Sequence, residues 1–138
     1  KNIVFGSNLF SKRFAGFGAA PQGFRKQKER MKKMNVQLSY KEGVLTAKLF
    51  GEIDHHSAKE MRESIDDTAQ KLKPYCLRLD FTGVPFMDSS GIGLILGRVR
   101  LCGFWRGHVV LSGLSQNLTK MVDLAGISGV AAIERRAG

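Results

Sequence analysis

The chain has 138 residues, of which 43% are hydrophobic and 25% charged, so it has room for one folded domain with an ordinary core. No segment approaches the run of about 18 apolar residues that a membrane-spanning helix needs, and residues 1–20 lack the apolar block of a signal peptide. We therefore expect a cytoplasmic protein without a membrane span.

The net charge of +10 is concentrated near the start of the chain. Residues 1–33 hold nine of the 22 Lys and Arg and one of the twelve acidic residues, which gives this segment a charge of +8. The rest of the chain carries only +2. Its charge therefore gives no support to a nucleic acid as partner.

Residues 1–33 show neither strand nor helix periodicity, and we expect a basic, disordered leader that precedes the folded domain. Five phenylalanines lie among glycines, followed by a run of basic residues at 25–33. Such an arm could contact an anionic membrane. We favour a leader that is not native: a purine-rich ribosome-binding segment read as protein, with the natural start at Met31 or Met34.

From residue 34 the hydrophobic pattern becomes regular. Residues 36–40 and 44–50 are strand-like runs joined by a turn at Lys41-Glu42-Gly43. Ser57-Ala-Lys-Glu60 has the form of a capping box and predicts the start of a helix, which Pro74 ends. The expected apolar stripe of that helix is Ala58, Met61, Ile65, Ala69 and Leu72.

The second half of the domain alternates strands and helices. Residues 75–81 alternate apolar and polar side chains, which predicts a strand in a sheet covered mainly on one side. A helix is expected from Ser90 to Leu101, a strand over 108–111, a helix capped by Ser115 and stopped by Gly126, and a strand over 130–133. Phe104-Trp105-Arg106 reads as a turn with a partly covered aromatic side chain. Cys76 and Cys102 read as buried, reduced thiols.

The order of elements is β-β-α-β-α-β-α-β and predicts an α/β fold. We expect residues 34–138 to form one domain: a four- to five-stranded mixed sheet with about three helices packed mainly on one face.

The stretch at residues 84–93 is the strongest candidate site. It places Ser89 and Ser90 at a helix start, where free backbone N–H groups and the helix dipole favour a phosphate. Gly91 and Gly93 would let a partner's backbone approach closely. The alternative is that one of the two serines is simply an N-cap, and spacing alone favours that reading.

Two acidic residues are expected to frame this surface. Asp54 and Asp88 each follow a strand, and the carboxyl ends of strands gather at one edge of an α/β sheet. His55 and His56 are adjacent and have no third ligand at a useful spacing, so we predict no metal site.

Enzymatic motifs are missing from the same stretch. A nucleophile elbow needs glycines two positions before and after the serine, but Asp88 and Ile92 stand there. No Gly-Lys-Ser/Thr sequence follows the glycines, as a phosphate-binding loop would need. We predict no catalytic residues, no enzyme activity and no cofactor.

The helix after Ser90 is expected to present a docking surface. We assign its buried stripe to Ile92, Ile95, Leu96 and Val99. Leu94, Gly97, Arg98 and Leu101 would then face outward, and this set is typical of a protein-binding surface.

Three motifs together resemble the STAS domain of anti-sigma factor antagonists, and are most similar to those of antagonists of an anti-sigma F factor in sporulation. The motifs are Gly51-Glu-Ile-Asp-His-His-Ser-Ala58, Phe86-Met-Asp-Ser-Ser-Gly-Ile-Gly-Leu-Ile-Leu-Gly-Arg98 and Leu118-Thr-Lys-Met-Val-Asp-Leu-Ala-Gly-Ile127.

The resemblance implies a partner-switching circuit. The unphosphorylated antagonist binds an anti-sigma factor that is also a serine kinase, and a sigma factor is released. The kinase uses ATP to phosphorylate the antagonist, and a serine phosphatase reverses this. Ser90 matches the phosphorylated serine, with Ser89 as the second choice, and Asp54 and Asp88 match acidic positions of the family's site. The alternatives are a module of a stress-signalling scaffold and a nucleotide- or small-molecule-binding STAS domain.

Overall fold

The structure is a computed structural model in which residues 3–4 and 35–134 are described. Along the chain it contains six strands, three α-helices and one short 3₁₀-helix within those residues. Their bounds are β1 Ile3–Val4, β2 Val36–Lys41, β3 Val44–Phe50, α3 His55–Leu72, β4 Cys76–Gly83, α4 Ser89–Gly103, β5 His108–Ser112, α5 Gln116–Leu124, η1 Ile127–Gly129 and β6 Ala132–Ile133.

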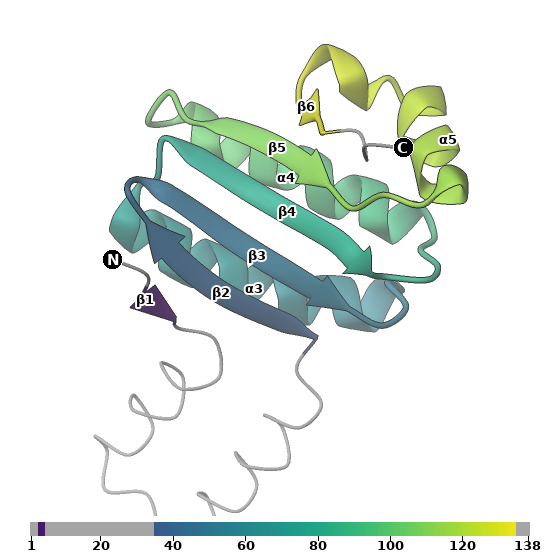
Figure 1. Ribbon diagram of the computed structural model, residues 1–138, viewed down its shortest axis with the longest axis horizontal. Coiled ribbons are helices and arrows are strands. Elements are labelled where there is room, and N and C mark those ends of the chain that lie inside the picture. Colours follow the sequence, from purple (N-terminus) through teal and green to yellow (C-terminus); the bar gives the residue numbers. More distant parts are fainter. Residues whose placement is uncertain (1–2, 5–34, 135–138) are drawn as a thin grey trace, which may run out of the picture.

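The strands form one mixed sheet in the order β1-β2-β3-β4-β5-β6. The pairs β1–β2 and β2–β3 are antiparallel, whereas β3 to β6 run parallel, with α3 and α4 as crossovers between β3, β4 and β5. Figure 1 shows α3 and α4 behind the sheet and α5 near the carboxyl end of β5. The predicted α/β class and mixed sheet are confirmed.

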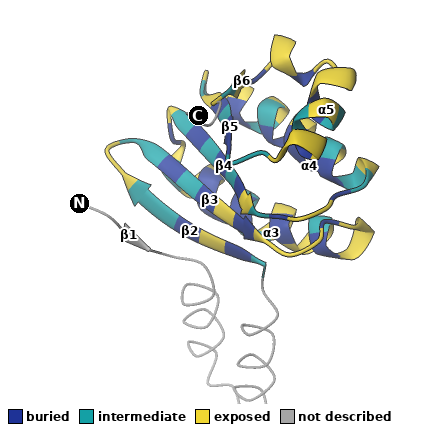
Figure 2. Ribbon diagram, turned by 45° about the vertical axis from the view of Figure 1, so that its right-hand side comes forward, coloured by how far each residue is buried: buried dark blue, intermediate teal, exposed yellow. Residues whose placement is uncertain are grey.

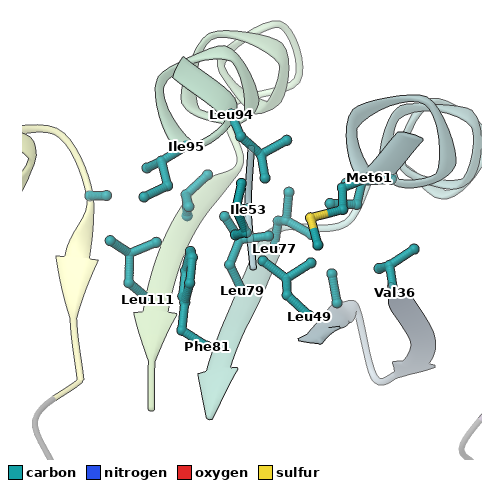
Figure 3. Close-up of a cluster of buried hydrophobic side chains, with 14 of the residues drawn as sticks. Val36, Leu49, Ile53, Met61, Leu77, Leu79, Phe81, Leu94, Ile95 and Leu111 are labelled. Atoms are coloured by element: carbon teal, nitrogen blue, oxygen red, sulfur yellow. The ribbon is translucent and has the colours of Figure 1, made fainter. Parts of the chain in front are cut away.

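The sheet is apolar on the face that α3 and α4 cover. Buried side chains alternate along the strands, as in Leu77, Leu79 and Phe81 of β4, and the register aligns Leu45, Leu77 and Val109 across three strands. Figure 3 shows these strands contributing to one cluster with side chains from α3 and α4. The other face carries polar residues such as Lys48, and Figure 2 shows buried residues alternating with more exposed ones along the strands. The prediction of a sheet covered mainly on one side is confirmed.

The edge strand β1 lies within the segment for which no packed element was expected. Ile3 and Val4 pair with Tyr40 and Ser39 and add a sixth strand to the predicted sheet. Residues 1–2 and 5–34 lie outside the described residues, so the disordered, non-native leader stays a prediction.

Helix α3 begins earlier than the sequence indicated. Its N-cap is Asp54, not Ser57, and the capping box is formed by Asp54 with Ser57 at the third helical position. The predicted box at Ser57–Glu60 was wrong. Aspartate is as good an N-cap as serine, so Asp54 caps the helix and pairs with Ser57, and the helix begins at His55. Met61, Ile65 and Ala69 are buried as expected.

The buried face of α4 differs from the predicted one by about one residue. Gly91, Leu94, Ile95, Arg98 and Cys102 are buried, whereas Leu96 is 42% exposed. Figure 3 shows Leu94 and Ile95 pointing towards the strand side chains. The outward placement of Leu94 and Arg98 was therefore wrong. A shift of one residue turns the buried face of a helix by 100°. A charged residue such as Arg98 is rarely found in a core, so nothing in the sequence indicated that it lies there.

Arg98 is buried because it pairs with α3. Its Nε lies 2.8 Å from Oδ1 of Asp66, and the Arg98 side chain is only 6% exposed. Burial raises the pKa of the Asp66 carboxyl, and the Arg98 guanidinium offsets part of this effect. The pair links the two helices that cover the sheet, and it takes Arg98 out of any docking surface.

The two cysteines differ in exposure. Cys102 is fully buried as predicted, and burial raises the pKa of its thiol to about 11, so the thiol stays protonated near neutral pH. Cys76 is only half-buried, because it starts β4 on the open face of the sheet. The prediction of a buried Cys76 was wrong.

We expect Arg98→Ala to lower the free energy of unfolding by about 2–3 kcal/mol, because it leaves the half-buried Asp66 carboxylate without its partner. Arg100→Ala is the matched control: Arg100 is exposed on the same helix, and the change should stay within about 0.5 kcal/mol. Urea denaturation measures both variants. Equal effects would contradict a structural role for the Arg98–Asp66 pair.

Candidate functional site

The starts of α3 and α4 lie side by side at the carboxyl edge of the sheet. An isolated parallel bridge joins Ile53 to Met87, just beyond the ends of β3 and β4. The Ile53 N–H donates to the Phe86 carbonyl at 3.0 Å, and the Asp88 N–H donates to the Ile53 carbonyl at 3.1 Å. The bridge fixes the two residues that follow it, Asp54 and Asp88, next to each other.

Asp54 is the N-cap of α3. One carboxylate oxygen accepts the Ser57 N–H at 2.9 Å, and the Ser57 hydroxyl accepts the Asp54 N–H at 2.9 Å. The Ser57 N–H lowers the pKa of the Asp54 carboxyl, because this hydrogen bond stabilises the charged form. Asp54 is exposed and stays ionised near neutral pH, so it places a negative charge on the surface.

Asp88 is the N-cap of α4. Its carboxylate accepts the Ser90 N–H at 2.7 Å. The reading in which Ser89 or Ser90 caps the helix was therefore wrong, because the preceding aspartate already does so. Ser89 and Ser90 are the first two residues of the helix; Ser89 is exposed and Ser90 is half-buried. Neither serine is needed as the N-cap.

Gly91 has a packing role. It is buried, and a Cβ built on it would lie 2.5 Å from Sδ of Met87, a fully buried residue of the bridge. The prediction that Gly91 opens the surface to a partner's backbone was wrong. Gly91 instead allows α4 to start directly over Met87, and this places Ser90 beside the bridge.

An exposed stripe runs along α4 from Ser89 towards the end of the helix. It consists of Ser89, Gly93, Leu96 and Arg100, all exposed and spaced by four, three and four residues. A Cβ at Gly93 or Gly97 would meet nothing within 4 Å, so the backbone of this helix face is open. This is the surface that the sequence assigned to Leu94 and Arg98. Gly93 remains in it and half-buried Gly97 lies beside it, whereas Leu96 and Arg100 replace the two buried residues.

An exposed phenylalanine lies next to the same edge. Phe86 is 57% exposed, and its carbonyl is one of the acceptors of the bridge. The edge therefore combines two carboxylates, two serine hydroxyls and an apolar side chain.

The adjacent histidines occupy the first two positions of α3. Both are exposed, with ring centroids 6.4 Å apart and an interplanar angle of 62°. Within the described ranges, no three His, Cys, Asp or Glu side chains gather closely enough to hold a metal ion. In the same residues, no helix combines the length and the apolar character that crossing a bilayer requires.

The fold corresponds to that of a known family. A family model described as "STAS domain" matches residues 35–136. The chain belongs to the STAS domain family.

Two similar curated proteins are named as anti-sigma factor antagonists. The chain is 30% identical to an anti-sigma F factor antagonist of Paenibacillus polymyxa over 94 residues, which cover 68% of this chain and 80% of the relative. It is also 30% identical to an anti-sigma-B factor antagonist of Listeria monocytogenes over 108 residues, covering 76% of this chain and 94% of the relative.

Two solved structures are similar along most of their length. The anti-sigma factor antagonist SpoIIAA in its unphosphorylated form has a TM-score of 0.61 and 27% identity, covering 74% of this chain and 89% of that one. The Bacillus cell fate determinant SpoIIAA in its phosphorylated form has a TM-score of 0.58 and 29% identity, covering 73% and 92%.

The STAS fold brings Asp54, Asp88, Ser89 and Ser90 to one edge, and it leaves Leu94 and Arg98 in the interior. Sequence reasoning missed Leu96 and Arg100. The glycines alone do not mark the exposed side of α4, because Gly91 is buried whereas Gly93 is exposed.

We expect Gly91→Ala to lower the free energy of unfolding by about 1–3 kcal/mol, because the new methyl group would overlap with the buried Met87 side chain. Gly93→Ala is the control two residues away. Its Cβ meets open space, and alanine is more favourable than glycine in a helix by up to about 1 kcal/mol. This variant should therefore be as stable as the parent or more stable. Thermal or urea unfolding that ranks the two variants in the opposite order would contradict the packing role of Gly91.

Proposed function

We propose that this STAS domain is an anti-sigma factor antagonist: its unphosphorylated form binds an anti-sigma factor serine kinase and so releases a sigma factor. Phosphorylation of Ser90 ends that binding, and a serine phosphatase restores it. The protein itself is not an enzyme and holds no cofactor; ATP belongs to the kinase. It acts in the cytoplasm.

The names of the relatives support antagonism, since both anti-sigma F and anti-sigma-B factor antagonists match the chain. SpoIIAA is known in a phosphorylated and an unphosphorylated form, and both resemble this chain over its folded part. The main structural support for phosphorylation of Ser90 comes from the start of α4. Ser90 stands at a helix start whose N-cap is already filled by Asp88, so its hydroxyl can change without loss of the cap.

The proposed phosphorylation adds negative charge at the carboxyl edge of the sheet, where α3 and α4 begin. The Ser90 hydroxyl attacks the γ-phosphorus of ATP, its proton leaves, and ADP departs with the electrons of the broken bond. The phosphate adds about −1.5 to −2 charges beside Asp54 and Asp88. The helix dipole and the first N–H groups of α4 stabilise that charge within the folded protein.

The same charge opposes docking. A partner that covers this edge must strip water from the phosphate and from the carboxylates of Asp54 and Asp88. Removing a net 2–4 kcal/mol from the binding free energy changes occupancy by about 30- to 1,000-fold. A change of charge alone is therefore sufficient, and the fold need not move.

The docking face in this proposal is the exposed stripe of α4 together with Phe86. Leu96 is the one large apolar side chain of that stripe, and the open backbone at Gly93 and Gly97 lets a partner approach closely around it. The stripe begins at Ser89, so docking and phosphorylation share one surface.

The module of a stress-signalling scaffold and the nucleotide-binding STAS domain are the alternatives, and no observation on the described residues favours either of them.

Phosphorylation of the chain by its cognate kinase should be lost in Ser90→Ala and retained in Ser89→Ala. The structure places the two hydroxyls one residue apart, so each variant is the control of the other. Radiolabelled ATP with peptide mass spectrometry measures the site directly. Loss of label in Ser89→Ala alone would move the assignment to Ser89, and label in both variants would contradict Ser90 as the one phosphorylated residue.

Leu96→Ser should weaken binding of the unphosphorylated chain to the kinase by about tenfold. That factor corresponds to about 1.4 kcal/mol, an ordinary cost for truncating an apolar side chain at an interface. Leu124→Ser is the matched control, because Leu124 is 89% exposed on α5 and lies outside the stripe. Calorimetric titration distinguishes them, and circular dichroism checks that both fold. Equal affinities for the two variants would contradict the α4 docking face.

A further inference from the structure

A second unusual surface lies at the opposite, amino-terminal edge of the parallel strands. The loops that precede β3, β4 and β5 meet there, on the left in Figure 1. Two of the most exposed aromatic residues of the described chain belong to these loops: Phe104 is 80% exposed and Tyr75 is 59% exposed. Trp105, which follows Phe104 directly, is half-buried, as the sequence indicated. We call these three residues the aromatic edge.

The aromatic edge is held in place by bonds between the loops. The Trp105 indole N–H donates to the Pro74 carbonyl at 2.8 Å, and the His108 N–H donates to the Tyr75 carbonyl at 2.8 Å. The Tyr75 N–H donates to the Gly43 carbonyl at 3.0 Å. These contacts order the loops, so the exposure of Phe104 and Tyr75 belongs to a defined surface.

Glycines make this close fit of the loops possible. A Cβ at Gly43 would lie 2.6 Å from the Tyr75 ring, and one at Gly107 would lie 2.8 Å from the Pro74 carbonyl oxygen and 2.9 Å from the Trp105 indole nitrogen. The loops are packed against each other through bare backbone at these two points.

All three described residues other than glycine that have a positive φ belong to the same loops. They are Glu42 at 50°, Lys73 at 45° and Arg106 at 59°. The left-handed conformation costs such residues roughly 1 kcal/mol, and glycine would avoid this cost. Two of the three carry a cation, and Lys41 adds another at the end of β2.

Charge is divided between the two ends of the strands. Lys41, Lys73 and Arg106 outnumber Glu42 at the aromatic edge, whereas Asp54 and Asp88 lie at the candidate site. Exposed aromatic rings beside cations fit an anionic surface with an apolar interior. Negatively charged lipid headgroups over acyl chains provide both.

We propose that the aromatic edge is a peripheral contact site for an anionic lipid bilayer, with Phe104 inserted into the headgroup region and Lys73 and Arg106 paired with lipid phosphates. The two edges are separated by the length of β4, eight residues or about 25 Å. A domain attached in this way presents Asp54, Asp88 and Ser90 away from the membrane, where a partner can reach them. The inference does not depend on the proposed function.

The chain carries its own reporter of this contact. Trp105 is its only tryptophan, so its fluorescence reports on the aromatic edge even if the basic residues of 1–33 also bind lipid. The experiment titrates the full chain with vesicles of phosphatidylcholine containing 30% phosphatidylglycerol, with and without bromine on the acyl chains. We expect brominated lipid to quench Trp105 in these vesicles, and vesicles of phosphatidylcholine alone to cause little quenching.

Matched variants locate the contact. Arg106→Gln should raise the lipid concentration for half-maximal quenching about fivefold, since one cation near an anionic bilayer contributes about 1 kcal/mol. Phe104→Ser should raise it about tenfold or more. Lys59→Gln and Leu124→Ser change an exposed cation and an exposed apolar residue elsewhere, and they should match the parent.

Three results would overturn the proposal. One is sedimentation of the chain with anionic vesicles while Trp105 stays unquenched, since binding would then occur elsewhere. The second is equal quenching by neutral and anionic vesicles. The third is no binding to either kind of vesicle. If an acidic protein then shielded Trp105 from a soluble quencher, the aromatic edge would be assigned to a protein partner. None of these results bears on phosphorylation of Ser90.

Discussion

The candidate site depends on one short bridge between two crossover connections. The backbone of Ile53 bonds to Phe86 on one side and to Asp88 on the other, and this pairing continues the β3–β4 ladder beyond the regular strands. Both helices start within two residues of it, so their N-caps and their dipoles point to the same edge. Met87 is buried beneath the bridge, and Gly91 leaves room for it. A backbone constraint, more than any single side chain, therefore places two carboxylates and a serine together.

Helix α4 packs against the core with one face and is exposed to solvent on the other. Leu94, Ile95 and Arg98 tie it to the core and to α3, while the opposite face leaves Leu96 and open backbone in solvent. Because the helix is anchored on one side by packing and by an ion pair, a charge added at its start meets a rigid surface. In the proposed switch, a phosphate on Ser90 would act through repulsion and desolvation at the proposed docking face, and the fold would not need to rearrange.

The sequence predicted the order of the strands and helices because period-two and helical patterns are strong signals, as in β4 and α3. It also placed Asp54, Asp88 and Ser90 at one edge, since strand ends gather there in any parallel α/β sheet. It failed on the orientation of α4, because Arg98 has a long charged side chain and its partner Asp66 lies 32 positions away on another helix. It also failed on the N-caps of α3 and α4, where several polar residues compete within three positions, but it placed the Ser115 cap of α5 correctly. Long-range pairing and local competition of this kind are decided by tertiary contacts.

The central claim is that negative charge at the start of α4 prevents docking while the fold stays the same. The most direct measurement is the dissociation constant of the cognate anti-sigma factor kinase for the native chain, compared between its unphosphorylated and its stoichiometrically phosphorylated form by titration calorimetry. The account predicts binding about 30- to 1,000-fold weaker for the phosphorylated form, with an unchanged far-ultraviolet circular dichroism spectrum. Equal affinity of the two forms would contradict it.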